Sequence, residues 1–264
     1  MEKRFGELFS ESWQEYRSNF KYFFIMIFLF IFIPSLLSLF VSIPWLADLS
    51  KLGDNPSFED SIKVMSNYTF FFVLSIIIGI ASFLLSIFCY TCIIYSSLNK
   101  KKFIKFSESV RGGKEHFLRY LGYSIVAGIF IIGLLILLVI PGIIFGIFWC
   151  FSAFIFIRER KGILASLKES HKLVKGKWWK TFGFILLFFI IIVVISILIS
   201  FLTELVNIII NPQIIKSLLD KSFYSSPIWY VNDFISLIGG FISNLISLPL
   251  GFLFIKNFYL DRKK

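Results

Sequence analysis

Charged residues are scarce in this chain of 264 residues: they make up 16% of it, whereas hydrophobic residues make up 57%. The chain has two histidines and three cysteines, and no nucleotide-binding loop, catalytic triad or metal-ligand cluster is recognisable in it. The longest stretch between apolar runs is about 30 residues, too short for a soluble catalytic domain. We therefore expect no enzyme activity, no catalytic residue, no metal site and no cofactor.

Long apolar sequence is what the chain has instead. Nearly uncharged runs cover 22–46, 68–98, 120–157, 181–203 and 234–258. A run of about 18 or more such residues is typical of a membrane-spanning helix, and a continuous run differs from the alternating pattern of barrel strands. The expected fold class is all-α: a polytopic membrane helical bundle forming a single integral membrane domain over 1–264.

The run 120–157 is too long for one span. As a helix its 38 residues would extend about 57 Å, against a hydrocarbon core about 30 Å thick. Pro141-Gly142 lies within it, and proline ends a helix while glycine tolerates the following turn. We expect a tight turn there and six spans in all, at about 22–46, 68–98, 120–140, 143–158, 181–203 and 234–258.

Basic residues test this topology. Of the 27 Lys and Arg residues, 23 fall in 1–21, 99–119, 158–180 and 256–264, and two fall in each of the segments 47–67 and 204–233. Since cytoplasmic loops retain Lys and Arg, both termini are expected inside. The net charge of +11 is then inner-face charge that favours anionic headgroups of the lipid bilayer as partners, not nucleic acid.

A short motif recurs before the first, third and fifth spans: Glu11-Ser12, Glu108-Ser109 and Glu169-Ser170. Eight residues after each serine stands Phe20, Phe117 or Trp178, with a basic residue one or two positions later. The pattern indicates a three-fold repeat of an amphipathic cytoplasmic helix plus a two-span hairpin, with units 1–98, 99–158 and 159–264. The alternative is chance, because Ser and Glu are common beside membranes.

The first and third of these segments have apolar residues at helical spacing, which is typical of interfacial helices. Their Glu-Ser pairs would face the cytoplasm or a neighbouring segment. The middle copy is weaker, because Gly112-Gly113 is expected to interrupt its helix.

Two groups of residues are candidate sites. The first group consists of three basic and two aromatic residues just before the fifth span: Lys175, Lys177, Trp178, Trp179 and Lys180. They are either ordinary anchors at the membrane surface or a contact for a lipid headgroup or partner. Glu204, Asp233 and Asn244 could approach one another at the external face as a polar site, or simply end their helices in water.

The remaining reactive side chains have simpler interpretations. Cys89-x-x-Cys92 has the spacing of a redox or metal motif, but it lies within a span with no second pair, so we expect packing residues. His116 and His171 lie in different segments without a convergent set of carboxylates, which favours ordinary interfacial histidines over a metal or acid–base site.

The stretch 137–183 resembles the membrane domain that precedes the catalytic domain in some glycerophosphodiester phosphodiesterases, and related stand-alone six-span prokaryotic membrane proteins of unknown function. The matching residues are Pro141-Gly142, Glu159, Ser166-Leu167-Lys168, Ser170, Leu173, Gly176, Trp178-Trp179 and Gly183, although the family usually has Ala where Ser166 stands. Ser12-Trp13, Tyr16 and Asn19-Phe20 are also similar. The resemblance implies a six-helix membrane unit, without the separate phosphodiesterase barrel.

The expected function is that of a non-catalytic scaffold, partner or lipid-interacting component of a prokaryotic cytoplasmic membrane, with a protein partner or homo-oligomer left open. The alternative is a small transporter or channel subunit. A transporter should place charged residues or broken helices at the midplane of the membrane, where this sequence has no charge.

Overall fold

The computed structural model describes residues 2–50, 57–98, 105–210, 212 and 229–263. It is 91% helical, and the described residues contain no strand. Six helical segments among them are long and apolar enough to cross a membrane: Phe20–Ser42, Thr69–Leu98, Phe106–Ile136, Val139–Glu159, Trp178–Ile210 and Val231–Arg262. The expected all-α bundle with six membrane-spanning segments is confirmed at this level.

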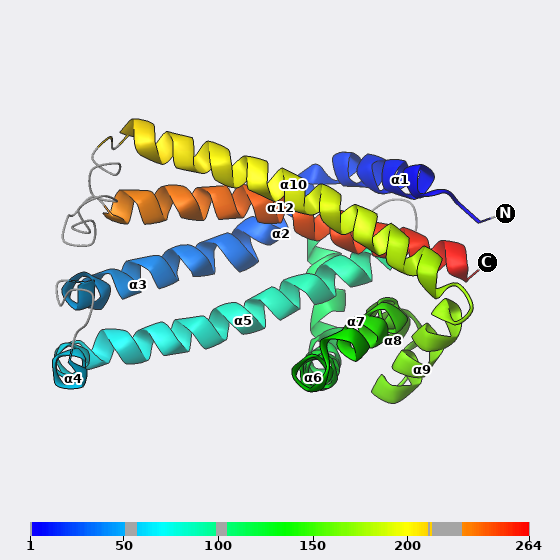
Figure 1. Cartoon of the computed structure of the whole chain (residues 1–264), viewed down its shortest axis with the longest axis horizontal. Coiled ribbons are helices and arrows are strands. Elements are labelled where there is room, and N and C mark those ends of the chain that lie inside the picture. Colours follow the sequence, from blue (N-terminus) through cyan, green and yellow to red (C-terminus); the bar gives the residue numbers. More distant parts are fainter. Residues whose placement is uncertain (1, 51–56, 99–104, 211, 213–228, 264) are drawn as a thin grey trace. The chain divides into compact units, whose positions relative to one another are not determined.

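The helices follow one another along the chain in the order labelled in Figure 1. They are α1 (Phe5–Ser18), α2 (Phe20–Ile27), the π-helix η1 (Phe28–Phe32), α3 (Ile33–Ser50), α4 (Phe58–Asn67), α5 (Thr69–Leu98), α6 (Phe106–Leu137), α7 (Val139–Phe148), α8 (Ser152–Glu159), α9 (Ile163–Val174), α10 (Trp178–Ile210) and α12 (Trp229–Arg262). The first span thus combines α2, η1 and α3. Its π-turn ends two residues before Pro34, which has no backbone N–H to continue regular helical bonding.

Internal contacts divide the chain into two compact units. Unit 1 comprises Met1–Ile25, Ile87–Val193 and Leu245–Lys264, and unit 2 comprises Met26–Ser86 and Val194–Asn244. The four basic segments of the sequence belong to unit 1, whereas the two segments expected outside belong to unit 2. Parts of these segments lie outside the described residues, namely 51–56, 99–104 and 213–228. They include Lys51, Lys216 and Lys221, which the sequence predicts on the external side.

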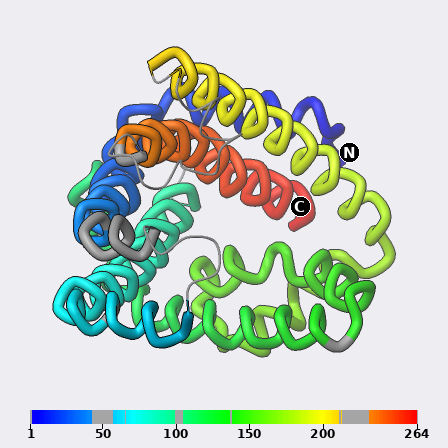
Figure 2. Tube along the Cα trace, turned by 60° about the vertical axis from the view of Figure 1, so that its left-hand side comes forward, coloured from blue at the N-terminus to red at the C-terminus, as the bar shows by residue number. Residues whose placement is uncertain are grey.

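Unit 1 contains most of the buried aromatic core. Phe151, Phe154, Phe254 and Tyr259 are among its largest fully buried side chains, and Phe188 stacks on Phe254 at 4.5 Å between ring centroids. Helices α6 to α9 pack on one another and form the green part of the tube in Figure 2. Burying these large aromatic side chains contributes strongly to the stability of unit 1.

In unit 2, α10 and α12 run antiparallel through small residues. A Cβ on Gly239 would lie 2.3 Å from the Thr203 hydroxyl oxygen, and Ser196 and Ser243 share a hydrogen bond of 3.1 Å. Phe32 of η1 packs on Phe241 at 4.8 Å between ring centroids. Small residues of the sixth span therefore allow close helix packing.

The turn between the third and fourth spans differs from the prediction. Helix α6 ends at Leu137, and the extended residue Leu138 separates it from α7. Pro141 lies in the first turn of α7, where a missing N–H is tolerated, and Gly142 is helical. A Cβ on Gly142 would lie 2.6 Å from Leu135 Cδ2 and 3.1 Å from Leu135 Cα. Pro141 and Gly142 therefore belong to the first turn of α7 and do not form the turn between the helices. The missing side chain of Gly142 lets α6 pack closely against α7.

The expectation that Gly112-Gly113 interrupts the middle segment was wrong, because α6 runs unbroken from Phe106 through both glycines into the third span. Each glycine faces α5 at close range. A Cβ on Gly112 would lie 2.1 Å from Tyr95 Cε1, and one on Gly113 would lie 2.2 Å from Cys92 Sγ. The pair permits close packing here and does not break the helix.

Candidate functional site

The Lys and Trp residues at the fifth span lie in the connection from α9 to α10 and in the first turn of α10. The α9 helix ends at Val174, Gly176 has a φ of +80°, and α10 begins at Trp178. Glycine suits this left-handed conformation because it has no Cβ to clash. The Lys177 N–H then donates to the Val174 carbonyl at 2.9 Å, which brings Lys177 and the two tryptophans together on one turn.

The two tryptophans form one wall of an apolar cavity. Trp178 stacks on Phe182 at 5.1 Å and donates from Nε1 to the Ile144 carbonyl at 3.3 Å, which ties α10 to α7. Trp179 meets Trp178 edge-on at 4.9 Å, and its side chain is 78% exposed. The cavity has a volume of about 540 Å³ and is lined by Ile140, Ile143, Ile144, Phe148, Trp178, Trp179 and Phe182.

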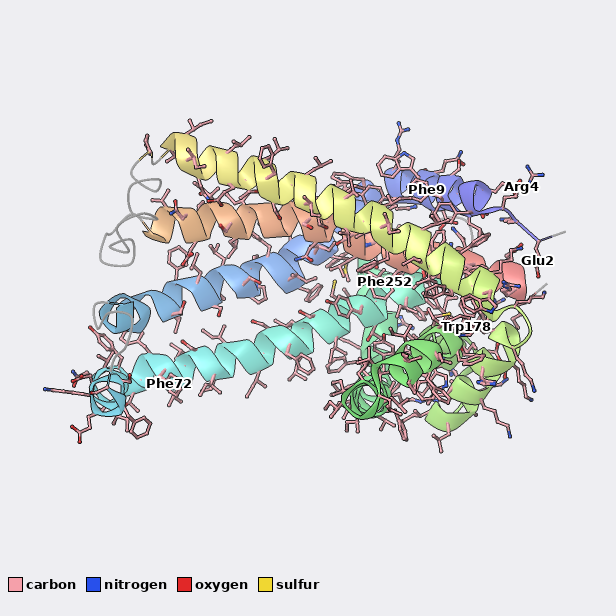
Figure 3. The ribbon with its side chains drawn as sticks, in the orientation of Figure 1. Glu2, Arg4, Phe9, Phe72, Trp178 and Phe252 are labelled. Carbon is pink, nitrogen blue, oxygen red and sulfur yellow. The ribbon has the colours of Figure 1, made fainter. Side chains whose placement is uncertain are left out.

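Three basic side chains surround the carboxylate of Glu2. Lys177 and Lys180 both bind it, Lys180 at 2.7 Å, and Arg262 binds it at 2.9 Å. Hydrogen bonds from Lys177 and then Lys180 lower the pKa of Glu2 to about 2. One negative charge faces three positive charges, so this cluster retains two positive charges at neutral pH. Figure 3 shows Glu2 at the end of α12 and Trp178 at the start of α10.

A second cavity joins the basic and aromatic residues. It has a volume of about 380 Å³ and is lined by Gly176, Lys177, Trp178, Trp179 and Lys180. Four of the five residues that the sequence singled out therefore line one cavity. Lys175 is exposed beside them but is not among the lining residues. Glu2 and Arg262 could not be predicted from the sequence, because no local pattern marks them. Glu2 lies 175 positions from Lys177, and Arg262 lies 82 positions from Lys180.

The polar residues expected near the external face do not all converge. Asp233 and Asn244 line one cavity of about 390 Å³ with Ser35, Ser38 and Ser42 of α3. Glu204 does not line it, and its carboxylate accepts a hydrogen bond from Asn207 on its own helix at 3.3 Å. The structure thus brings together two of the three predicted residues.

Two further asparagines of unit 2 were missed by the sequence analysis. Asn207 and Asn232 are 2% and 9% exposed, and neither side-chain amide oxygen has a hydrogen-bond partner among the described residues. Their burial was not predicted because both lie close to helix ends, where an asparagine side chain is usually solvated.

The serines of the repeated motif are all fully buried. Ser12 accepts a hydrogen bond from Asn257 Nδ2 at 3.1 Å, while Ser109 bonds to Tyr22 and Ser96 at 2.6 Å each. Ser170 donates to the Phe148 carbonyl at 2.7 Å, and it accepts from the Phe151 N–H at 3.2 Å.

Each serine thus joins its segment to an even-numbered span: Ser12 to the sixth, Ser109 to the second and Ser170 to the fourth. The expectation was that the Glu-Ser pairs face the cytoplasm or a neighbouring segment, whereas these serine partners lie in apolar helices long enough to cross a membrane. The three-fold repeat itself stays a prediction that this shared role supports.

The glutamates of the motif have less in common. Glu11 pairs with Lys3 and Glu169 pairs with Lys161, each within its own segment, whereas Glu108 is exposed and forms no ion pair with another described residue. Glu169, together with Glu159, raises the pKa of Lys161, with Glu159 the larger cause. Glu11 and Glu169 therefore each bind a lysine of their own segment.

The cysteines and histidines occupy separate packed positions. Cys89, Cys92 and Cys150 form no disulfide with one another, and Cys89 and Cys92 are buried. His116 bonds through Nδ1 to the Gly112 carbonyl at 2.9 Å, and His171 stacks on Phe148 at 4.1 Å. Within the described ranges no three His, Cys, Asp or Glu side chains are grouped to hold a metal ion.

Comparison of the chain with protein-family models, with curated proteins and with solved structures found no match. The resemblance to the membrane domain of glycerophosphodiester phosphodiesterases therefore stays a prediction, and the function is argued from the site.

Proposed function

We propose that this chain is a non-catalytic multi-pass protein of a prokaryotic cytoplasmic membrane, with both termini in the cytoplasm, that acts as a lipid-interacting or scaffolding component. The single observation that supports it best is the pair of adjoining cavities at Trp178 and Trp179, one apolar and the other flanked by Lys177 and Lys180. Apolar and cationic surfaces side by side match the two parts of a phospholipid.

The orientation rests on the distribution of charge. The segments with 23 of the 27 basic residues all belong to unit 1, and cytoplasmic segments retain Lys and Arg. Anionic headgroups of the inner leaflet are then the expected partners.

Native mass spectrometry of the detergent-extracted protein tests this function, because it reads bound lipids and subunits together. We expect lipid to remain on the protein, with or without a protein partner or second copy. Complete loss of lipid from a folded, single-copy protein would contradict both the lipid-interacting and the scaffolding role.

A small transporter or channel subunit is the second candidate, supported by the cavity that Asp233 and Asn244 line with three serines. Polar groups within a membrane-spanning region commonly mark a permeation path. Ion flux into proteoliposomes that is abolished by Asp233→Asn would favour this candidate over the first.

A further inference from the structure

We propose that the two cavities at the start of α10 together bind one anionic phospholipid, with its phosphate held between Lys177 and Lys180 and an acyl chain in the apolar cavity. This site rests on the proposed lipid-interacting function, and it specifies which lipid is bound and where. Trp178 and Trp179 line both cavities, so a single molecule can occupy both.

The apolar cavity is suited to an acyl chain. All of its lining residues are hydrophobic or aromatic, and they come from α7 and α10, which belong to two membrane-spanning segments. Ile140 is 72% exposed and Trp179 is 78% exposed, so the protein itself leaves this surface uncovered. Tryptophan prefers the depth at which headgroups meet acyl chains, which places the boundary between the two parts of the lipid at this pair.

The basic cavity selects an anionic headgroup. The side chains of Lys177 and Lys180 are 51% and 38% exposed although both bind Glu2, and the cluster retains two positive charges. A phosphate with no cation of its own would neutralise part of this excess. A phosphocholine headgroup carries a quaternary ammonium cation beside its phosphate. This cation would be repelled by the lysines, so phosphatidylcholine should bind less tightly. A soluble acidic peptide would satisfy the lysines but would leave the apolar cavity empty.

Glu2 has a distinct role in this arrangement, because its carboxylate occupies the same lysines that would hold the phosphate. It is an internal competitor for the lipid. Removing its charge should therefore strengthen lipid binding, whereas removing the lysine charges should weaken it. If the lysines serve only to hold the N-terminus, both changes should act in the same direction.

The test measures lipid retention by the full chain. Wild type and variants are reconstituted in nanodiscs of equal phosphatidylglycerol and phosphatidylcholine, extracted in mild detergent and read by native mass spectrometry. Lys177→Gln/Lys180→Gln should lower phosphatidylglycerol affinity about 25-fold, and Glu2→Gln should raise it about fivefold, from the usual effect of each charge near an anionic lipid. Trp179→Ala should weaken the binding of both lipids, since Trp179 lines both cavities.

The matched control is Lys168→Gln/Lys172→Gln, which removes two exposed charges from α9 and should leave retention unchanged. Equal losses in the control and the Lys177/Lys180 variant, or a loss with Glu2→Gln, would overturn the site. So would normal retention in Trp179→Ala, which would indicate an acidic ligand without an acyl chain. If the Lys177/Lys180 variant fails to fold, Glu2→Gln and Trp179→Ala still decide. Equal retention of both lipids by wild type would refute the anionic selectivity alone, whereas no retention of either would refute the proposed function as well.

Discussion

At the scale of single residues, the buried serines show how a polar group can be more important to folding than its neighbours of the same type. The motif Phe106-Ser107-Glu108-Ser109 contains both kinds: Ser109 is fully buried and bonded to Tyr22 and Ser96, whereas Ser107 is exposed. Losing a hydrogen bond destabilises a protein more in an apolar environment than at the surface, because water cannot replace the lost partner there.

Ser109→Ala should destabilise the protein by about 0.5–1.5 kcal/mol, since it removes the hydrogen bonds of Ser109 to Tyr22 and Ser96 while these two hydroxyls remain bonded to each other. Ser107→Ala should change stability by less than about 0.5 kcal/mol, because the side chain is exposed. Apparent melting temperatures in one detergent measure both. Equal melting temperatures for the two variants would contradict the structural role of Ser109.

Glu2 makes the stability of unit 1 dependent on pH. Its pKa is lowered from 4.5 to about 2 in the folded protein, so its ionised form stabilises the fold fully above pH 4.5. That stabilisation should decrease as the pH falls from about 4.5 to about 2. Each partly exposed ion pair contributes only about 0.2–1 kcal/mol, so the effect is modest.

The comparison of wild type with Glu2→Gln isolates this effect. The wild type should melt at a higher temperature at pH 7, and the difference should shrink between pH 4.5 and pH 2. A difference that stays constant over that range would show that the Glu2 charge does not stabilise the fold.

At the scale of elements, the α6–α7 hairpin depends on one glycine of α7 but not on another. A Cβ on Gly142 would meet Leu135, including its backbone at 3.1 Å, whereas nothing lies within 4 Å of a Cβ on Gly146. Alanine is otherwise about 1 kcal/mol better than glycine within a helix.

Gly142→Ala should therefore destabilise the protein, and Gly146→Ala should stabilise it by up to about 1 kcal/mol. The melting temperatures of the two variants should move in opposite directions. A stabilised Gly142→Ala would show that α6 and α7 do not approach each other as closely as the structure has them.

At the scale of the whole molecule, the proposed orientation is open to direct labelling. Glu59 of α4 and Lys172 of α9 are both exposed, and they belong to segments expected on opposite sides of the membrane. In a background without the native cysteines, an impermeant thiol reagent should label Glu59→Cys in intact cells. Lys172→Cys should react only after permeabilisation, and its labelling from outside would contradict the proposed topology.

Much of the architecture could be predicted because hydropathy is a local property. A long apolar run must form its backbone hydrogen bonds internally within a bilayer, so composition alone predicts a helix for each run. The six apolar spans, the first and third helical segments before them and the group of basic and aromatic residues at 175–180 all follow from neighbours in the sequence. The turn was misplaced because Pro and Gly signal both turns and helix starts, and packing against Leu135 selects between them.

The remainder depended on residues far apart in the chain. Nothing near Glu2 indicates that its carboxylate meets Lys177, Lys180 and Arg262, and nothing near Ser12 indicates Asn257. Glu204 was grouped with Asp233 on sequence, yet the folded chain places only Asp233 and Asn244 on one cavity. Apolar runs therefore specify which segments become membrane helices, since the free energy of placing a run in the bilayer depends on the residues of that run alone. Which polar side chains meet is decided only when the helices pack, because a hydrogen bond or ion pair needs both partners within about 3 Å.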